Sequence, residues 1–338
     1  MAEPELSSAK EILVLNNTIQ NLKTHINEQI IGQQRLVDRL LIALLADGHL
    51  LVEGAPGLAK TRAIKVLSEG IEGDFQRVQF TPDLLPADLT GTDIYRPQDG
   101  SFKFQQGPLF HNLVLADEIN RAPAKVQSAL LEAMAERTIT VGSTTYPLPE
   151  LFLVMATQNP IEQEGTYPLP EAQLDRFLLH VFVDYPDSAA EKSILKLNRN
   201  EAIRQTDLAN KAISQTSPQV SQADLFSARQ QILSVHMAEN LEDYLLKIII
   251  STRKAATYGD DLASWIEYGA SPRASIALDR CARAHAWLAG RDFVTPEDIQ
   301  EMAHDVLRHR IILSFEAEAE GITKDMFIHT LISRIAVP

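Results

Sequence analysis

The stretch Gly54-Ala-Pro-Gly57-Leu-Ala59-Lys60-Thr61 lies between a short apolar segment at 49–53 and a segment of helical character at 60–70. A glycine-containing turn that opens a helix presents several backbone N–H groups in one direction, and the helix dipole adds positive potential there. Lys60 can reach the β- and γ-phosphates of a nucleotide, and the hydroxyl of Thr61 can bind Mg²⁺. The stretch therefore predicts a phosphate-binding loop between a strand and a helix.

This loop departs from the general pattern at one position, because Ala59 stands where glycine is usual. Alanine is the smallest replacement, yet it places a Cβ at a tight point of the turn. We still expect every residue of the loop to contribute to nucleotide binding. These residues are Gly54, Ala55, Pro56, Gly57, Leu58, Ala59, Lys60 and Thr61.

Two adjacent acids, Asp117 and Glu118, end a nearly continuous apolar strand expected at 112–117. Ligands of open α/β sheets bind at the carboxyl ends of the strands. Asp117 would hold Mg²⁺ directly or through water, and Glu118 would polarise the attacking water. An acidic strand end that only faces solvent is the alternative, but the phosphate-binding loop upstream favours the metal and catalytic roles.

Two further polar residues are candidates for contact with the nucleotide. Asn159 follows the strand expected at 151–157, and its amide could orient the water or touch the γ-phosphate. On residue type alone a turn is favoured there, because Asn-Pro is a common turn pair. Arg273 lies near the start of a helix opened by Ser271-Pro272, where a cation faces the positive end of the helix dipole. A bound phosphate would turn that cost into a gain, and the alternative is an arginine that faces solvent.

Arg176 is the last candidate, and it lies in Leu174-Asp-Arg-Phe177 just before the final expected strand. Taken alone, this arginine has a structural alternative. It could form an ion pair with Asp175 or Glu171.

Apolar strands alternate with helices over the first half of the chain, which predicts an α/β fold with a parallel sheet covered by helices on both faces. Two insertions interrupt this pattern. One spans 81–107, and the other, at 138–148, reads as a β-hairpin around Gly142-Ser143. The expected strands are 49–53, 75–80, 112–117, 151–157 and 178–184, and the expected helices are 8–28, 33–46, 60–70 and 123–136.

The pattern changes after 184, where Ser188 and Glu191 form the ends of an expected capping box that opens a helix. The polar residues 201–220 are interpreted as a connection. From 221 onward we expect helices only, at 222–237, 241–257, 272–289, 296–309 and 323–334. The sequence thus predicts two domains: an α/β domain at 1–190 and an all-helical lid domain at 191–338.

Composition narrows the class of protein. The chain has 338 residues and a net charge of −14, so it repels phosphate backbones and has no overall support for binding nucleic acid. Its one cysteine, Cys281, lies in an apolar helical stretch and is expected to be a buried thiol. No apolar leader segment and no apolar run of transmembrane length stand out, so a cytoplasmic protein without a membrane span is expected.

Taken in order, these motifs resemble the AAA+ ATPases, and the finer ones resemble the MoxR family within them. The resemblance extends over about 25–310 and includes Ala59, so that alanine is the family's own usage. The family-specific segments are Gly-Ala-Pro-Gly-Leu-Ala-Lys-Thr at 54–61, Ala-Asp-Glu-Ile-Asn-Arg-Ala-Pro at 116–123, Thr-Gln-Asn-Pro at 157–160 and Leu-Pro-Glu-Ala-Gln-Leu-Asp-Arg-Phe at 169–177.

The resemblance assigns a role to each candidate residue. It implies that Asn159 is sensor 1, that Arg176 is an arginine finger acting on a neighbouring subunit, and that Arg273 is sensor 2. Ile31, within Ile30-Ile31-Gly32-Gln33, would contact the adenine. The insertion at 81–107 resembles the helix-2 insert, and the hairpin at 138–148 resembles the pre-sensor-1 hairpin.

The resemblance also implies an activity and an assembly. With ATP and Mg²⁺ as cofactors, the catalytic residues would be Glu118, Asn159, Arg176 and Arg273, and the metal ligands Thr61 and Asp117. The family is implied to form homo-oligomeric, hexameric rings. It acts in a chaperone-like way on partner proteins, often ones with a von Willebrand factor A domain and sometimes in metal insertion or the maturation of complexes.

Three other functions compete with this hypothesis. A nucleic-acid motor of the helicase type shares both insertions, but the hairpin at 138–148 carries no Lys or Arg to track phosphates. A nucleotide-dependent scaffold without hydrolysis would not need Glu118. A magnesium-chelatase-like subunit is not separated from the leading hypothesis by any single residue.

Overall fold

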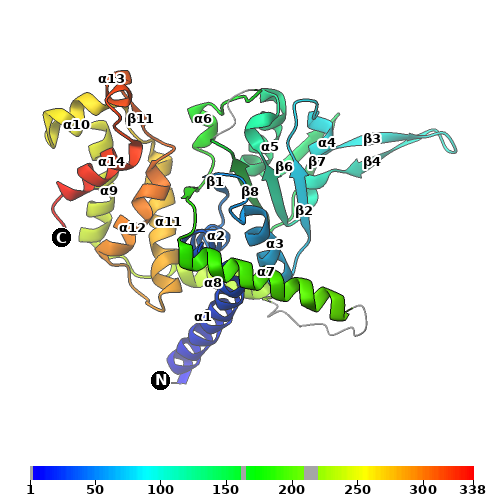
Figure 1. Cartoon of the computed structure of the whole chain (residues 1–338), viewed down its shortest axis with the longest axis horizontal. Helices are drawn as coiled ribbons and strands as arrows, with labels where there is room; N and C mark the ends of the chain where they lie inside the picture. Colours follow the sequence, from blue (N-terminus) through cyan, green and yellow to red (C-terminus); the bar gives the residue numbers. More distant parts are fainter. Residues whose placement is uncertain (1–2, 161–164, 209–219) are drawn as a thin grey trace. The chain divides into compact units, whose positions relative to one another are not determined.

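The structure is a computed structural model that describes residues 3–160, 165–208 and 220–338. The chain divides into two compact units, which are treated separately below (Figure 1). Unit 1 comprises Met1–Leu41, Val52–Tyr167 and Phe182–Phe226, and unit 2 comprises Ile42–Leu51, Pro168–Val181 and Ser227–Pro338. The division into 1–190 and 191–338 stays a prediction.

A five-stranded sheet in the order β2-β5-β8-β1-β9 positions the motifs. Strand β5 pairs in parallel with β2 and with β8, and Gln79 lies opposite Asp117 in the β2–β5 register. Strands β5 and β8 are buried along almost their whole length, which explains their continuous apolar sequences. All five predicted strands are confirmed, as β1 (Leu50–Gly54), β2 (Phe75–Gln79), β5 (Leu113–Asp117), β8 (Leu153–Gln158) and β9 (Leu179–Val183).

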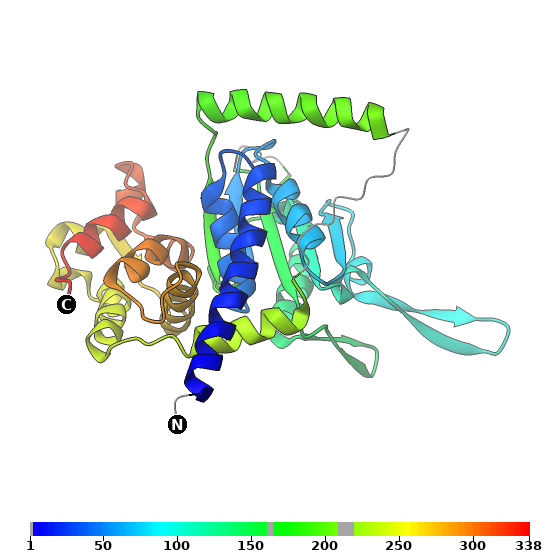
Figure 2. The same ribbon diagram turned by 90° about the horizontal axis from the view of Figure 1, so that it is seen from below.

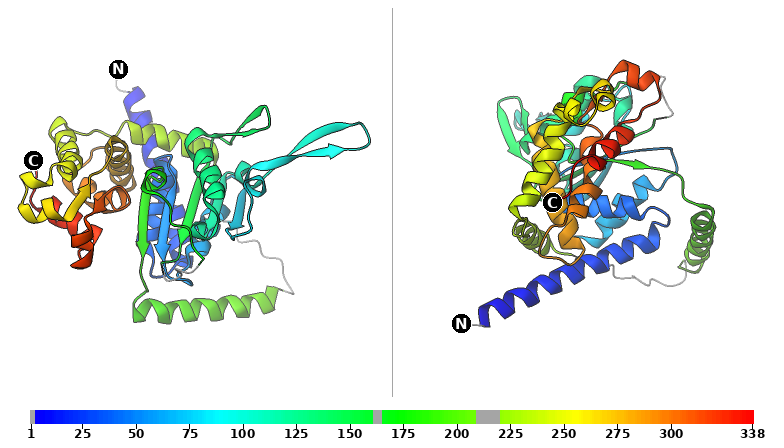
Figure 3. Two further views of the ribbon diagram at one scale, coloured as in Figure 1. Left: turned by 90° about the horizontal axis from the view of Figure 1, so that it is seen from above. Right: turned by 90° about the vertical axis from the view of Figure 1, so that its left-hand side faces the viewer.

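Helices alternate with these strands, as the sequence predicts. Helix α1 packs on α3, and α3 packs on β5. Ile19 and Leu22 of α1 and Ile64 of α3 are fully buried. Figure 3 shows α1 as a long helix whose first turns extend beyond the sheet. The helices are α1 (Glu3–Gln29), α2 (Gln34–Leu45), α3 (Lys60–Gly70), α5 (Ala124–Glu136), α7 (Ser188–Leu208) and α8 (Gln222–Leu233), with a 3-10 turn η2 at Ile119–Arg121.

Both insertions of unit 1 contain a β-hairpin. The first insertion holds a short helix, α4 (Pro86–Thr90), and then strands β3 (Gly91–Arg96) and β4 (Ser101–Gln106) before a 3-10 turn η1 (Pro108–Phe110). The second is the predicted hairpin, formed by β6 (Thr138–Val141) and β7 (Thr144–Pro147). Figure 2 shows both hairpins projecting from the sheet. Their bases are joined where the rings of Phe104 and Tyr146 stack with centroids 4.1 Å apart.

The segment after the last strand corrects two predictions. Helix α7 continues to Leu208, so the interpretation of 201–220 as a connection is wrong for 201–208. Residues 209–219 lie outside the described part of the chain. The N-cap of α7 is Asp187, whose Oδ1 accepts the backbone N–H of Ala190 at 2.7 Å, and the predicted cap Ser188 is the first helical residue. Asp187 satisfies the helix N-terminus one residue earlier than the sequence pattern suggested.

Unit 2 is mainly helical, but the prediction of helices only after residue 221 is wrong in one detail. Two short strands, β10 (Ile266–Tyr268) and β11 (Ile312–Leu313), pair in an antiparallel way. No helix in the described ranges is long and apolar enough to cross a bilayer. The remaining helices are α6 (Glu171–Leu174), α9 (Glu239–Arg253), η3 (Ala255–Thr257), α10 (Asp260–Trp265), α11 (Pro272–Leu288), α12 (Pro296–Leu307), α13 (Phe315–Ala319) and α14 (Lys324–Ser333).

The predicted helix starts in unit 2 are confirmed. The Ser271 side chain accepts the backbone N–H of Arg273, and Pro272 takes the first helical position of α11. Thr295 and Asp298 form a capping box at the start of α12. Cys281 is buried, as predicted.

The buried carboxylate of Asp298 links the start of α12 to the last turn of α11 and to Arg291 between the two helices. Its oxygens accept two hydrogen bonds of 2.6 Å from Arg291 and one of 2.6 Å from His285, and only 1% of its side chain is exposed. Burial by itself raises the pKa of Asp298. The hydrogen bonds from Arg291, His285 and the Thr295 backbone outweigh burial and hold this pKa well below its usual range.

We predict that Asp298→Asn lowers the free energy of unfolding by about 3 kcal/mol at neutral pH, because Arg291 loses a buried partner. A carboxyl whose folded pKa is depressed stabilises the fold above its unfolded pKa, and this stabilisation fades as the pH falls toward the folded pKa. The difference between wild type and variant should therefore shrink below about pH 4. Urea unfolding followed by circular dichroism at several pH values measures it.

The matched control is Asp261→Asn, which removes a similar bidentate pair with Arg334 from the surface of the same unit. Because water screens that pair, its loss should cost far less. Equal losses for the two variants, or a loss for Asp298→Asn that does not depend on pH, would contradict this account of the cluster.

Candidate functional site

The glycine-containing loop has the geometry that phosphate binding requires. It leaves β1 at Gly54 and enters α3 at Lys60, and Gly57 has a positive φ of 84° that favours glycine. No side chain caps the N-terminus of α3. The N–H groups of its first turn are thus available to an anion, which the helix dipole also favours.

Ala59 has a backbone conformation that explains why glycine is usual at its position. Its φ of 58° and ψ of 14° lie in the left-handed region, where a Cβ costs about 1–2 kcal/mol. The strain that the sequence predicts is therefore present in the backbone dihedrals. Strained non-glycine residues of this kind concentrate at functional sites.

Lys60 projects back across the loop. Its Nζ donates to the carbonyl oxygen of Gly54 at 2.5 Å and to that of Gln158 at 3.4 Å. Burial lowers the pKa of Lys60, and the carboxylates of Asp117, Glu118 and Glu53 oppose this shift. Negative charge placed on the loop would stabilise the ammonium group in the same way.

Asp117 is held at the end of β5 by two neighbouring strands. Its Oδ2 accepts hydrogen bonds from Nε and Nη2 of Arg77 on β2, at 3.1 and 2.6 Å. Its Oδ1 accepts the hydroxyl of Thr157 on β8, at 2.6 Å. The same hydroxyl accepts the backbone N–H of Glu118 at 2.9 Å. Thr157 thus fixes both acids relative to the sheet.

Glu118 adopts a left-handed conformation, with φ 57° and ψ 51°. Its Oε2 accepts hydrogen bonds from Nε2 of Gln79 at 2.7 Å and from Nη1 of Arg121 at 3.0 Å. About a quarter of the side chain is exposed, at 26%. The carboxylate is therefore held by polar neighbours while it can still reach water.

These residues line one pocket of unit 1. The pocket brings the loop together with both acids and with Asn159, which is 6% exposed. Nine predicted site residues from three separate segments thus meet in one place, including Lys60, Thr61, Asp117, Glu118 and Asn159. The lining is completed by Pro56, Gly57, Leu58, Ala59, Arg62, Arg77 and Thr157.

The side chains around this pocket fit a nucleotide-bound Mg²⁺ better than a metal held by protein alone. The hydroxyl of Thr61 and the carboxylate of Asp117 line the same pocket. The described residues contain no group of three or more His, Cys, Asp or Glu that could hold a metal. Mg²⁺ in phosphate-transfer sites typically uses one or two carboxylates and takes its remaining ligands from phosphates and water.

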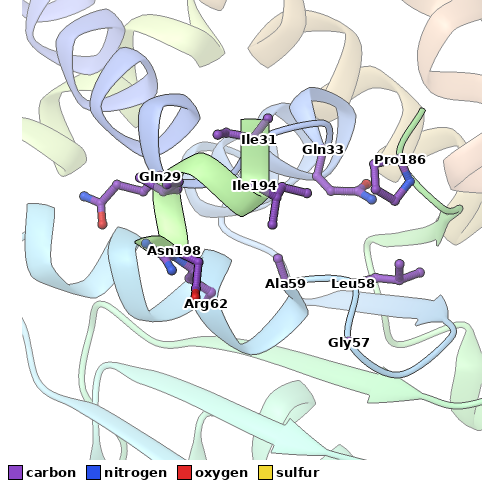
Figure 4. A pocket seen from close by; sticks show the side chains of 11 residues that line it. Gln29, Ile31, Gln33, Gly57, Leu58, Ala59, Arg62, Pro186, Ile194 and Asn198 are labelled. Carbon is purple, nitrogen blue, oxygen red and sulfur yellow. The ribbon is translucent and has the colours of Figure 1, made fainter. Parts of the chain in front are cut away.

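A second, more apolar pocket adjoins the loop and contains Ile31 (Figure 4). It shares Gly57, Leu58, Ala59 and Arg62 with the first pocket. In Figure 4 the side chain of Ile194 points toward Ala59, and that of Ile31 lies above Ile194. The other lining residues are Gln29, Gln33, Pro186, Leu197 and Asn198.

The strip that carries Ile31 is anchored to the chain after β9. Nε2 of Gln33 donates to the carbonyl oxygen of Asp184 at 2.8 Å. Gly32 has φ 79°, and a Cβ there would lie 2.9 Å from the side chains of Pro186 and Ala190. The close approach of these two segments therefore requires glycine at position 32.

Sequence reasoning missed several residues that line the two pockets or contact their acids. Arg77 and Gln79 occupy alternate positions on β2 and therefore face the same acids, a pattern that the predicted strand at 75–80 already contained. Thr157 precedes Asn159 at the end of β8. Nothing in the sequence around Ile194 and Leu197 pointed to a ligand-binding role, because they reach the pocket only when α7 packs beside the loop.

The two predicted arginines lie in unit 2. Arg176 makes no ion pair with Asp175 or Glu171 in the part of the chain that the structure describes, so its structural alternative is not observed there. Asp175 pairs instead with Arg310, Nε to Oδ1 at 2.8 Å, and lies 3.9 Å from Nη1 of Arg273. Arg273 is 61% exposed.

Comparison with known proteins agrees with this geometry. Residues 49–179 match the model of the ATPase family associated with various cellular activities (AAA), and residues 262–331 match the AAA lid domain. A crystal structure of a candidate ATPase from Cytophaga hutchinsonii superposes with a TM-score of 0.88 at 46% identity, covering 99% of both chains.

Two relatives share most of the chain. Chaperone MoxR1 of Mycobacterium tuberculosis is 43% identical over 95% of this chain and 83% of its own length. Protein MoxR of Methylorubrum extorquens is 31% identical over 89% of this chain and 90% of its own. The chain therefore belongs to the MoxR family of AAA+ ATPases.

Proposed function

We propose that the protein hydrolyses ATP in the presence of Mg²⁺ within an oligomeric ring and uses the reaction to remodel or mature a partner protein. One observation carries the catalytic part of this proposal. The phosphate-binding loop, Asp117, Glu118 and Asn159 line a single pocket although they come from three separate segments of the chain.

The two adjoining pockets fit the two ends of ATP. The phosphates would lie on the loop, against the first-turn N–H groups of α3 and the ammonium of Lys60. The adenine would lie between the apolar side chains of Ile31, Leu58 and Ile194. Gly57, Leu58 and Ala59 line both pockets, so one ligand can occupy the two at once.

The metal would be held by Thr61 and Asp117 together with the phosphates, and it would neutralise charge that develops on them. Arg77 and Thr157 orient the Asp117 carboxylate. Their bonds fix Asp117 before ligand arrives, which reduces the reorganisation that the reaction needs.

Glu118 would act on the attacking water. Gln79 and Arg121 both bond Oε2, so the carboxylate is oriented by one of its oxygens. A carboxylate held in this way can accept a proton from the water. Asn159, at the same edge of the sheet, would position the water or the γ-phosphate as sensor 1.

Arg176 and Arg273 would complete the reaction from unit 2. We propose that Arg273 contacts the nucleotide of its own protomer as sensor 2, and that Arg176 contacts the γ-phosphate of the neighbouring protomer as an arginine finger. The ring would be hexameric, with a protein substrate that carries a von Willebrand factor A domain. A cytoplasmic location belongs to the same proposal.

We predict that Glu118→Gln binds ATP within a few-fold of wild type and turns it over at least about 100-fold more slowly. The amide keeps the shape of the side chain but cannot take a proton. Glu132→Gln is the control, because Glu132 is exposed on α5 of the same unit. Steady-state phosphate release and calorimetric titration measure the two quantities. Turnover within tenfold of wild type would remove Glu118 from the role of base.

We also predict that Arg176→Ala binds ATP nearly normally and hydrolyses it about 10³-fold more slowly or worse. Mixing it with Lys60→Ala should restore part of the activity, because an intact site from the first variant then lies beside an intact finger from the second. Random mixing of equal amounts into a ring would make about a quarter of the sites complete.

The control replaces either parent with the double variant Lys60→Ala/Arg176→Ala, which can contribute neither a site nor a finger. Phosphate release is measured at concentrations where size-exclusion chromatography shows assembly. If the parent mixture assembles but gains no activity over its components, the trans role of Arg176 is wrong.

A further inference from the structure

The carboxylate of Asp175, directly before Arg176, is bonded on both of its oxygens. Oδ1 accepts Nε of Arg310 at 2.8 Å, and Oδ2 accepts the hydroxyl of Ser271 at 3.0 Å. Only 16% of the Asp175 side chain is exposed. Three segments of unit 2 far apart in the sequence therefore converge on one acid.

Arg310 also holds the backbone on the other side of Arg176. Its Nη2 donates to the carbonyl oxygen of Phe177 at 2.6 Å, and its Nη1 donates to that of Leu178 at 3.2 Å. The Arg310 side chain is 3% exposed, so these bonds form away from water, where they are strong. The single guanidinium fixes the residues on both flanks of Arg176.

His309 adds a second donor to the same carbonyl. Its Nε2 lies 3.0 Å from the oxygen of Phe177. Burial, with the neighbouring charge of Arg310, holds the pKa of His309 well below its usual range, so the ring is neutral and Nε2 carries the donated proton. Phe177 itself is fully buried.

The side chain of Arg176 is held quite differently from its backbone. It is partly exposed, and none of the described residues of unit 2 forms an ion pair with it. The backbone of Arg176 is thus fixed, while its guanidinium forms no ion pair within the described part of unit 2. This arrangement suits a side chain that must contact a group outside its own unit. The position of Arg176 matters because displacing a catalytic group by about 1 Å can lower the reaction rate about 100-fold.

Asp175 also links this segment to the start of α11. Ser271, which donates to Asp175, is the N-cap of α11 and accepts the backbone N–H of Arg273 at 3.2 Å. Nη1 of Arg273 lies 3.9 Å from the same Asp175 oxygen, Oδ2. The Asp175 carboxylate therefore connects the backbone next to Arg176 with α11, the helix that carries Arg273.

We propose that Asp175 is a positioning residue, anchored by Arg310, that fixes Arg176 for its reaction in the neighbouring protomer and joins it to the N-terminus of α11. The inference rests on the proposed function of Arg176. It adds Asp175 and Arg310 to the residues on which hydrolysis depends. It also means that Arg273 and Arg176 can affect one another through the hydrogen bond between Ser271 and Asp175.

A mixed assembly separates this role from general stability. In such an assembly the Lys60→Ala subunit supplies only the finger, and the Arg176→Ala subunit supplies only the nucleotide site. We call them the finger donor and the site donor. Because the finger donor does not hydrolyse ATP itself, a further change in it affects activity only through the finger that it presents.

Asp175→Asn is placed first in the finger donor and then in the site donor. In the finger donor it should lower kcat of the mixture about tenfold or more, with KM for ATP unchanged, because the binding site belongs to the other subunit. In the site donor, which has no finger to position, the loss of kcat should be at least about fivefold smaller.

Ser271→Ala provides a second variant in case Asp175→Asn does not fold. Placed in the finger donor, it should lower kcat about threefold or more, because Asp175 loses one of its two partners. Ser314→Ala is its matched control. The Ser314 hydroxyl is also an N-cap in unit 2 and also accepts one hydrogen bond and donates one, but it has no bond to Asp175. It should leave the mixture within about twofold of the parents.

The outcomes are distinct. Larger losses in the finger donor than in the site donor, together with a loss for Ser271→Ala that exceeds that for Ser314→Ala, support the proposal. If the parent mixture is active but Asp175→Asn acts equally from both subunits, or if the two serine variants behave alike, the positioning role is overturned and the trans reaction stands. If the parent mixture itself gains no activity, the trans reaction is wrong and this inference falls with it.

Discussion

Two carboxylates at the end of one buried strand are the constraint around which this protein is organised. Asp117 and Glu118 are adjacent in the chain and lie in one pocket, where neither can be left without a partner. The surrounding structure supplies donors from several directions: Arg77 and Gln79 from β2, and Thr157 from β8.

The same constraint explains the phosphate-binding loop. Burial lowers the pKa of Lys60, and the charges of both acids oppose this shift without cancelling it. Left-handed backbone at Ala59 and at Glu118 shows that the chain tolerates strain at the two points where the groups must be aimed.

The sequence predicted most of this site because its signals are local. Buried parallel strands read as apolar runs, and the groups at their carboxyl ends are found by position alone, so Lys60, Asp117, Glu118 and Asn159 were all identified in advance. Arg77 and Gln79 were missed because their role depends on the order of strands, which places β2 next to β5. Ile194 was missed for a similar reason, because its place beside the loop depends on where α7 packs and not on the local sequence.

The arginines of unit 2 show a different limit. The sequence left open whether Arg176 pairs with its neighbour Asp175, and nothing in the local pattern points to Arg310, which is more than a hundred residues away and takes that carboxylate instead. Ion-pair choice in a folded protein depends on tertiary packing, which outweighs sequence proximity. The family relationship suggested a role for Arg176, but only the packing shows what holds it.

The central claim is that MgATP binds on the loop at 54–61, and calorimetric titration of the wild type and of Lys60→Ala tests it most directly. The account predicts that the wild type binds ATP with Mg²⁺ and that the variant binds at least about 100-fold more weakly, because a partly buried cation beside the phosphates is lost. Lys65→Ala, an exposed lysine on the same helix, should bind as the wild type does. Equal affinity of wild type and Lys60→Ala for MgATP would show that the phosphates bind elsewhere and would contradict the account.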